Sequence, residues 1–153
     1  RDEERGTEAQ SAVVAKERAQ FLPSDQARRL EWQQACLPDP TLPGGVSAVV
    51  SNSLLHHLHE PAVLWNSIKH VAAPGCVVVI HDLRRPHNEE GLQQLVERHA
   101  ATAPAVLKRD YEASLRAAFS AEEVHQQLQQ AQLPQLKVIE REDRYLTVWG
   151  QLA

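Results

Sequence analysis

A short run of β-branched residues that ends in small polar side chains constrains the fold most. Residues 46–50 read V-S-A-V-V, and Ser51 and Asn52 follow directly. Such a short and almost uninterrupted apolar run is typical of a strand buried on both faces of a parallel sheet. Ligands of open α/β sheets bind at the carboxyl ends of such strands, so we expect Ser51 and Asn52 to lie at a binding edge.

The residues after this strand predict an α/β chain that ends in an antiparallel pair. Pro61 suits the first turn of a helix that stops at Pro74-Gly75. A second buried strand is predicted over residues 76–80, followed by helices that begin near Asn88 and Pro104. Ser120 and Glu123 have capping-box spacing, which predicts a helix over residues 121–131. Two strands joined by a tight turn are then predicted over residues 136–140 and 144–150.

The residues before this strand carry weaker signals. Residues 1–10 are polar and aperiodic, so we expect them to be disordered or the remnant of a longer segment. Apolar residues at helical spacing predict a helix over residues 11–22. Residues 30–35, L-E-W-Q-Q-A, alternate enough to predict a short strand, and a Pro- and Gly-rich loop over residues 37–45 separates that strand from the next one.

Composition and charge narrow the possible partners. The 153 residues carry a net charge of -4, and the 16 Lys and Arg are scattered, so no phosphate-binding footprint for nucleic acid is visible. A small-molecule partner is favoured instead. The two cysteines have no metal or disulfide-framework spacing, which favours a reducing, cytoplasmic setting. No apolar run is long enough for a membrane span, so we expect no membrane association.

Three motifs together resemble the class I S-adenosylmethionine (SAM)-dependent methyltransferases. They are S-N-S-L-L-H-H-L at residues 51–58, A-A-P-G at 72–75 and D-L-R-R-P at 82–86. The resemblance implies a Rossmann-like sheet with helices on both faces and an antiparallel last strand. The resemblance covers residues 11–153, which would form a partial methyltransferase domain. It implies SAM as the cofactor, and methyl transfer to a small molecule as the activity of the complete protein.

The resemblance also suggests site residues. It places the methionine part of the cofactor at Asn52, and the residues that it assigns to cofactor binding are Cys36, Asp39, Ser51, Asn52 and Ser53. An amide at a strand end offers a donor and an acceptor, although Asn52 could simply end the strand. His56 and His57 are the candidate catalytic bases, because the pKa of histidine lies near neutral pH. Both could instead begin the next helix.

The end of the second strand supplies the candidate substrate-binding residues Asp82, Arg84 and Arg85, which we expect to face the same crevice as Asn52. An arginine there could hold a carboxylate or phosphate of the acceptor. A solvated turn paired with Glu89 and Glu90 is the alternative interpretation. A metal site built from the histidines and Asp82 is a further alternative, but the spacing matches no known closed site, and no metal is assigned.

Departures from the family pattern predict an incomplete domain. No G-x-G loop is present, and the sequence contains no methionine, which indicates a fragment or a processed chain. In the family, whose strand order is 3-2-1-4-5-7-6, two strands that are missing here separate residues 30–35 from residues 46–50. We therefore expect an unpaired apolar edge, marginal stability and poor cofactor binding by the chain alone, or else re-pairing of residues 30–35 beside residues 46–50. A non-catalytic interaction domain and a histidine-based metal-binding domain remain the alternative functions.

Overall fold

The computed structural model describes residues 23–153, so the segments predicted over residues 1–10 and 11–22 lie outside the described residues. The chain divides into residues 1–36 and residues 37–153. The described part of the first unit contains α2 (Ser24–Ala27), and its residues 30–36 form no strand. The strand predicted over residues 30–35 is therefore wrong. A strand needs a neighbour to satisfy its backbone groups, and no other described strand pairs with this segment.

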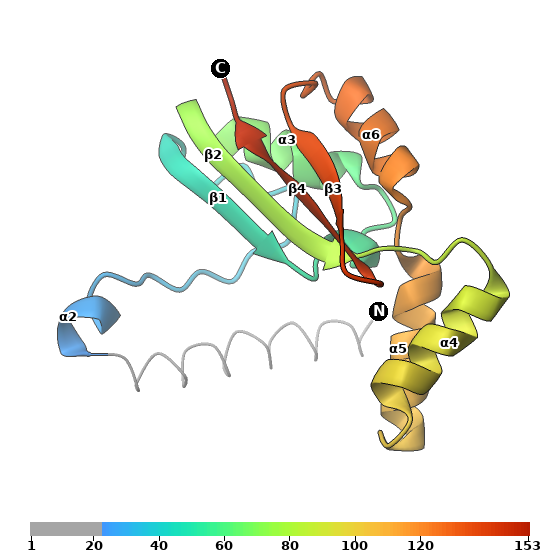
Figure 1. The fold of residues 1–153 in the computed structure, drawn as a ribbon. Helices are drawn as coiled ribbons and strands as arrows, with labels where there is room; N and C mark the ends of the chain where they lie inside the picture. The colour runs from blue at the N-terminus through green and yellow to red at the C-terminus, as the bar shows by residue number, and fades with distance from the viewer. Residues whose placement is uncertain (1–22) are drawn as a thin grey trace. The chain divides into compact units, whose positions relative to one another are not determined.

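Residues 37–153 form a four-stranded sheet with helices (Figure 1). The elements in chain order are β1 (Val46–Asn52), the 3₁₀ turn η1 (Leu55–His57), α3 (Ala62–Val71), β2 (Ala72–Leu83), α4 (Glu89–Ala100), α5 (Ala105–Ala117), α6 (Ala121–Gln130), β3 (Lys137–Arg141) and β4 (Tyr145–Gln151). The strand order is β1-β2-β4-β3. β1 runs parallel to β2, whereas β4 is antiparallel to both of its neighbours. The strands predicted after residue 45, their directions and the antiparallel finish are confirmed. The helix ends earlier than predicted, at Val71, and β2 already begins at Ala72, so Pro74-Gly75 lies within the strand.

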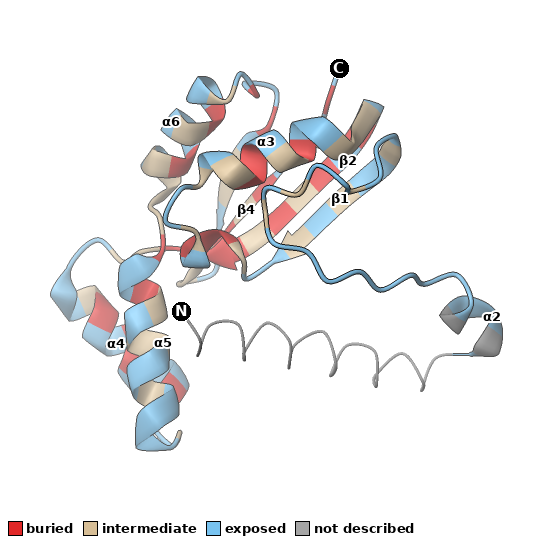
Figure 2. Ribbon diagram, turned by 180° about the vertical axis from the view of Figure 1, so that it is seen from behind, coloured by how far each residue is buried: buried red, intermediate tan, exposed pale blue. Residues whose placement is uncertain are grey.

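Within residues 37–153, helices cover one face of the sheet and leave the other face open. Seen from behind in Figure 2, α3 and α6 lie across the covered face. Side chains that point to this face alternate along each strand, as the period of two requires. They form the main core with residues of the turn and helices, and its larger members are Leu55, Leu64, Trp65, Ile68, Val78, Ile80, Val124, Leu128, Leu146 and Val148.

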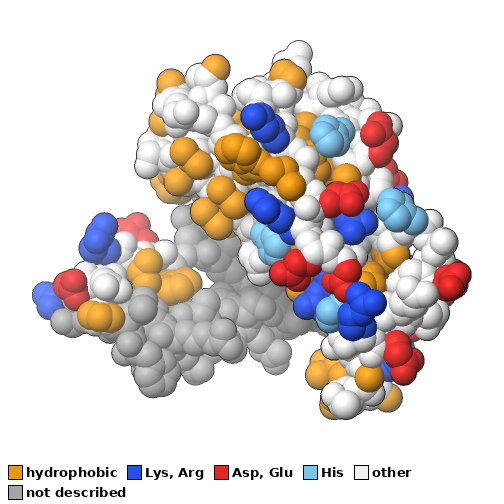
Figure 3. Space-filling model, in the orientation of Figure 1, with side chains coloured by type: hydrophobic (Ala, Val, Ile, Leu, Met, Phe, Trp, Pro, Cys, Tyr) orange, Lys and Arg blue, Asp and Glu red, His pale blue; other side chains and the backbone are white. Residues whose placement is uncertain are grey.

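The open face carries exposed apolar side chains. Strand register places Val50, Val79 and Trp149 side by side across β1, β2 and β4. Figure 3 shows hydrophobic side chains gathered over the sheet on this face. Val50 is 75% exposed, so the prediction that its strand is buried on both faces is wrong. β1 is an edge strand in the described sheet, and such an unpaired apolar edge was expected.

Local caps fix where the helices begin. The Ser120 hydroxyl accepts a hydrogen bond from Glu123 N at 3.2 Å, and the Glu123 carboxylate accepts one from Ser120 N at 2.7 Å. This reciprocal pair is the predicted capping box. Asn88 caps α4 by accepting from Gly91 N at 2.8 Å, also as predicted. Pro61 directly precedes α3, where its missing N–H costs nothing.

The α4–α5 hairpin lies near the end of the sheet at which β1 and β2 terminate (Figure 1). It has a small core of its own, formed by Leu83, Leu92, Leu95, Val96, Leu115 and Ala118. Two side chains of the hairpin lie outside this small core. Leu107 is 57% exposed near the open end of the hairpin, and His99 is at the surface, where its Nε2 lies 2.9 Å from the Asp143 carboxylate.

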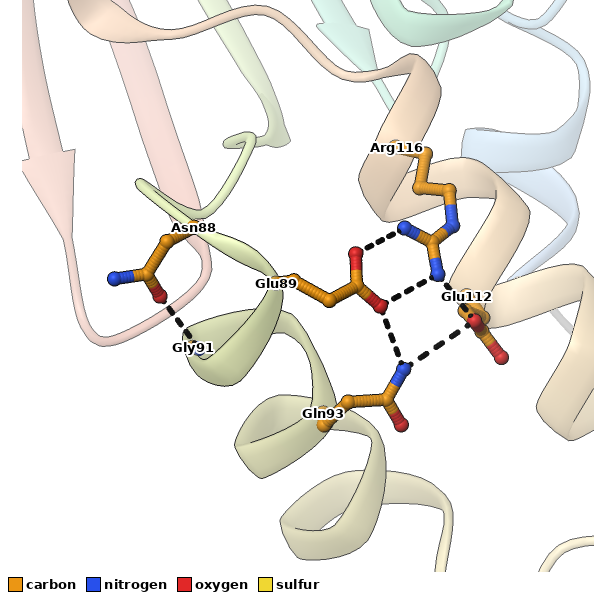
Figure 4. A network of polar contacts seen from close by, with 6 residues as sticks. All are labelled: Asn88, Glu89, Gly91, Gln93, Glu112 and Arg116. Atoms are coloured by element: carbon orange, nitrogen blue, oxygen red, sulfur yellow. Dashed lines mark hydrogen bonds and ion pairs between the residues drawn. The ribbon is translucent and has the colours of Figure 1, made fainter.

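A polar network joins the two helices of this hairpin (Figure 4). Arg116 donates to both carboxylate oxygens of Glu89, at 2.5 and 2.8 Å, and to Glu112 at 2.6 Å. Hydrogen bonds from Arg116 and Gln93 lower the pKa of Glu89 to about 2. The network lies at the surface, so salt and water weaken it, but its bidentate geometry fixes the relative orientation of α4 and α5.

Within residues 23–153 no helix is long and apolar enough to cross a lipid bilayer.

Trp65 links α3 to α6 in the main core, so its removal tests the packing of the covered face. Its side chain is fully buried, and its Nε1 donates to Gln127 Oε1 at 3.1 Å. We expect Trp65→Ala to lower the free energy of unfolding by about 3–5 kcal/mol. The matched control Trp149→Ala removes an exposed indole from the open face and should cost less than about 1 kcal/mol. Urea unfolding followed by circular dichroism measures both, and equal losses would contradict the assignment of the two faces.

The hairpin network predicts a pH-dependent contribution to stability. The pKa of Glu89 is lowered from 4.5 to about 2 in the folded chain. The pairing therefore stabilises the fold fully above pH 4.5, and this contribution is lost as the pH falls toward about 2. We expect Arg116→Gln to lower Tm at neutral pH and the difference from the unmodified chain to shrink at acid pH. Arg109→Gln, which removes an exposed arginine of the same hairpin, serves as the control. A Tm difference that does not depend on pH would argue against the network.

Candidate active site

The parallel strands β1 and β2 end side by side, as expected for a binding edge. Asn52 is the register partner of His81, and Ser53 N donates to His81 O at 2.9 Å. Ser53 has a φ of 56°, so the backbone turns sharply after the strand. The Asn52 side chain is exposed and donates from Nδ2 to Ser53 Oγ at 3.3 Å. The edge therefore presents an amide and a hydroxyl to a ligand.

Asp82 fixes the turn that follows this edge. Its side chain is only 1% exposed, and its Oδ2 accepts a hydrogen bond from Leu55 N at 2.7 Å. Its Oδ1 accepts from Leu83 N at 2.8 Å and lies 2.5 Å from Nδ1 of His56. A buried carboxylate needs such partners, and here they tie η1 to the end of β2. The structure therefore places Asp82 in the interior, with its carboxylate directed at η1.

The two candidate catalytic histidines have different environments. His56 is 7% exposed, and its ring faces Asp82. His57 is exposed at the surface, with its ring centroid 4.0 Å from that of His56. Desolvation and the neighbouring His56 lower the pKa of His57, which Asp82 partly opposes. Of the two, only His57 presents its imidazole to solvent.

The two candidate arginines are held by different partners. Nη2 of Arg85 pairs with Glu123, the capping-box residue of α6. Arg84 is 8% exposed and donates from Nη2 to the Asp143 backbone oxygen at 3.2 Å, while its Nε has no partner among the described residues. The alternative interpretation, a solvated turn, required these arginines to pair with Glu89 and Glu90. Neither arginine does so, and Glu89 binds Arg116 instead.

A cavity of about 320 Å³ lies beside Arg84, between the end of β2, the start of α4 and the β3–β4 turn. Its polar lining includes Arg84, His87, Asn88, Arg98, Glu140 and Asp143. Hydrogen bonds from His99 and Arg98 lower the pKa of Asp143 to about 2. The direct neighbour of Asn52 on β2 is His81, whereas Arg84 lines this separate cavity. The cavity offers both signs of charge to a polar ligand.

Two of the three remaining candidate cofactor residues, Cys36 and Asp39, lie before β1, and Ser51 lies within it. Cys36 is an exposed residue of the first unit. Asp39 accepts hydrogen bonds from both N and Oγ1 of Thr41, and these bonds lower the pKa of Asp39. Its carboxylate therefore organises the loop before β1. The Ser51 hydroxyl is buried without a partner among the described residues.

The metal alternative has no ligand set in the structure. Over residues 23–153, no group of three or more His, Cys, Asp or Glu side chains is arranged to hold a metal ion. Asp82 instead binds backbone N–H groups and a single histidine. His81 is one of the histidines of that metal alternative, and its position beside Asn52 was not predicted. The predicted pairing of the two parallel strands could have revealed it.

Loss of the Asp82 carboxylate should release η1. We expect Asp82→Ala to lower the free energy of unfolding by on the order of 3–5 kcal/mol, because it leaves His56 and the Leu55 N–H buried without their partner. Hydrogen exchange at the Leu55 amide should accelerate in this variant. Asp110→Ala, at an exposed position on α5, is the control. Unchanged protection of Leu55 would show that Asp82 does not hold the turn.

Comparison with known proteins supports the fold. No protein-family model matches the sequence, and no curated protein is detectably similar to it in sequence. Solved structures are similar nonetheless. A SAM-dependent methyltransferase from Aquifex aeolicus aligns with a TM-score of 0.56 and 17% identity, over 84% of this chain and 57% of its own. PigF solved with S-adenosylhomocysteine (SAH) aligns with a TM-score of 0.58 and 14% identity, over 94% of this chain and 41% of its own.

The plantazolicin methyltransferase BpumL, in complex with a monoazolic desmethylPZN analog and SAH, aligns with a TM-score of 0.52 and 10% identity, over 73% of this chain and 53% of its own. The chain thus spans about half the length of these structures. At sequence identities this low, the similarity shows a shared fold alone. Mixed strand directions and the order β1-β2-β4-β3 agree with the 4-5-7-6 part of the family's sheet. The chain has the fold of the class I SAM-dependent methyltransferases.

Proposed function

We propose that this chain is the acceptor-side part of a SAM-dependent methyltransferase that acts on a small molecule. The observation that carries the proposal is the shared carboxyl end of β1 and β2, where Asn52 and His81 are register partners. Open α/β sheets bind their ligands at such ends. Two of the structures with this fold were solved with SAH, which supports a related cofactor here.

The residues at this edge fit one end of the cofactor. The methionine part of SAM carries an ammonium and a carboxylate, and Asn52 offers both an acceptor and donors. Ser53 adds a hydroxyl. Ser51, in register with Ile80, lies on the covered face instead, where its buried hydroxyl has no partner among the described residues. When bound, SAM supplies an electrophilic methyl group. Asp39 stays a candidate for the adenosine end, but its carboxylate already accepts hydrogen bonds from Thr41.

We therefore propose that the adenosine end needs residues beyond 37–153, and that the chain alone binds the cofactor poorly. Residues 37–153 contain no G-x-G loop that would let the backbone approach a ligand closely. The open edge of β1 is consistent with additional strands beside it in the complete protein.

Positioning is the main task of a methyltransferase, because nucleophile, methyl carbon and sulfur must lie in line. We propose that the acceptor lies between the strand ends and the α4–α5 hairpin, since α5 contacts η1. Arg84 stays a candidate for an acidic group of the acceptor. It lines the separate 320 Å³ cavity, however, and its Nη1 already lies 3.6 Å from the Glu140 carboxylate. His57 stays a candidate base, whereas His56 would have to leave Asp82 to act.

A non-catalytic interaction domain is the second candidate function. The exposed side chains Val50, Val77 and Trp149 on the open face favour it, because exposed apolar patches commonly mark contact surfaces. The net charge of -4 and the scattered basic residues argue against nucleic acid as the partner. We propose a cytoplasmic location on the basis of the cysteine pattern.

Calorimetric titration of SAH separates the two candidate functions. We expect binding by the complete protein and little or none by residues 1–153. In the complete protein, Asn52→Ala should weaken binding by about tenfold, the loss of roughly one hydrogen bond to a charged group. Asn66→Ala, at an exposed position on α3, is the matched control and should bind normally. If the complete protein does not bind SAH, the methyltransferase proposal is wrong and the interaction domain is the better account.

A further inference from the structure

We propose that His81 is the residue that accepts the proton from the methyl acceptor. The inference rests on the proposed function and names a group outside the predicted catalytic pair. His81 lies at the carboxyl end of β2 as the register partner of Asn52. Along β2 the side chains alternate, and since Ile80 and Asp82 point to the covered face, His81 points to the open one.

Two contacts hold the imidazole of His81. Its Nδ1 lies 3.0 Å from Oγ1 of Thr147, the partner of His81 on β4. Its ring packs at 4.7 Å against the ring of Tyr145, which in turn lies under the Arg144 guanidinium. A histidine that is hydrogen-bonded at one nitrogen has its tautomer set by that bond. If Nδ1–H donates to Thr147, Nε2 carries the lone pair.

Nε2 of His81 is available for chemistry. It makes no hydrogen bond to any of the described residues, and the side chain is only half-buried. His56 lacks this availability, because it is buried against Asp82. The ring of His57 is exposed but is not fixed by a hydrogen bond within the described part of the chain. His81 thus combines a ring held at Nδ1 with an Nε2 that has no partner among the described residues, beside Asn52.

The chemistry balances without a further reactant. The acceptor's oxygen or nitrogen loses its proton to Nε2 of His81 and bonds to the methyl carbon of SAM with its own electron pair. The electron pair of the broken carbon–sulfur bond stays on sulfur, which leaves a neutral thioether. The positive charge of the sulfonium is replaced by that of the imidazolium. A base at this position can then release the proton to water after product leaves.

The tautomer of His81 can be read in the chain itself. Long-range ¹H–¹⁵N spectra of residues 1–153 should show His81 protonated at Nδ1 at a pH where the ring is neutral. Thr147→Val removes the hydroxyl at nearly constant volume and should shift the population toward the Nε2–H tautomer. Thr102→Val, in the turn between α4 and α5, is the control. An Nε2–H tautomer in the unmodified chain would overturn the proposal.

A chemical probe tests whether Nε2 faces the site. Diethyl pyrocarbonate acylates accessible, unprotonated imidazole nitrogens, and peptide mass spectrometry reports the rate at each histidine. In the complete protein we expect His81 to react, and SAH at ten times its Kd to slow that reaction by about tenfold. The exposed His70 on α3 should react equally with and without SAH.

The outcomes separate this inference from the proposed function. If SAH binds by calorimetry but does not protect His81, or if His81 is inert, then the role of His81 is wrong while the methyltransferase proposal stands. If SAH does not bind at all, the proposed function fails and this inference fails with it. Protection of His81 together with the Nδ1–H tautomer supports both.

Discussion

The buried carboxylate of Asp82 is the interaction on which the candidate site depends. It binds the Leu55 N–H, the Leu83 N–H and the His56 ring, so the turn after β1 is tied to the end of β2. Burying a charge without such partners would cost several kcal/mol, which explains why all three contacts converge on this side chain. Because the turn is fixed, the left-handed backbone of Ser53 and the exposed Asn52 before it are fixed as well.

Within residues 37–153, the two faces of the sheet carry different kinds of side chain. α3 and α6 cover one face, where Trp65 and the capping box of Ser120 and Glu123 hold them in place. The other face exposes Val50 and Trp149, and its polar end carries Asn52 and His81. The α4–α5 hairpin adds a wall near the same end, braced by the Arg116 network. We propose that this edge positions the two ligands of the methyl transfer in line.

Local signals in the sequence predicted most of the fold. The capping box, the Asn88 cap and the alternation in the strands depend on residues near one another in the chain, so they could be read directly. The contact between His56 and Asp82 joins residues 26 positions apart, and the periodicity of a segment cannot predict such a long-range contact. The burial of individual side chains was also predicted less well than the secondary structure. Val50 is apolar, but its exposure depends on which elements lie beside it, and the pattern of a single segment does not contain that information.

Mapping SAH onto the complete protein by NMR tests the central claim most directly. The account predicts that amide shifts change most at residues 51–53 and at His81, with smaller changes in η1, and that the covered face stays unperturbed. Shifts confined to the cavity beside Arg84 and α4, or to the apolar open face around Trp149, would contradict the claim that the ends of β1 and β2 form a methyltransferase site.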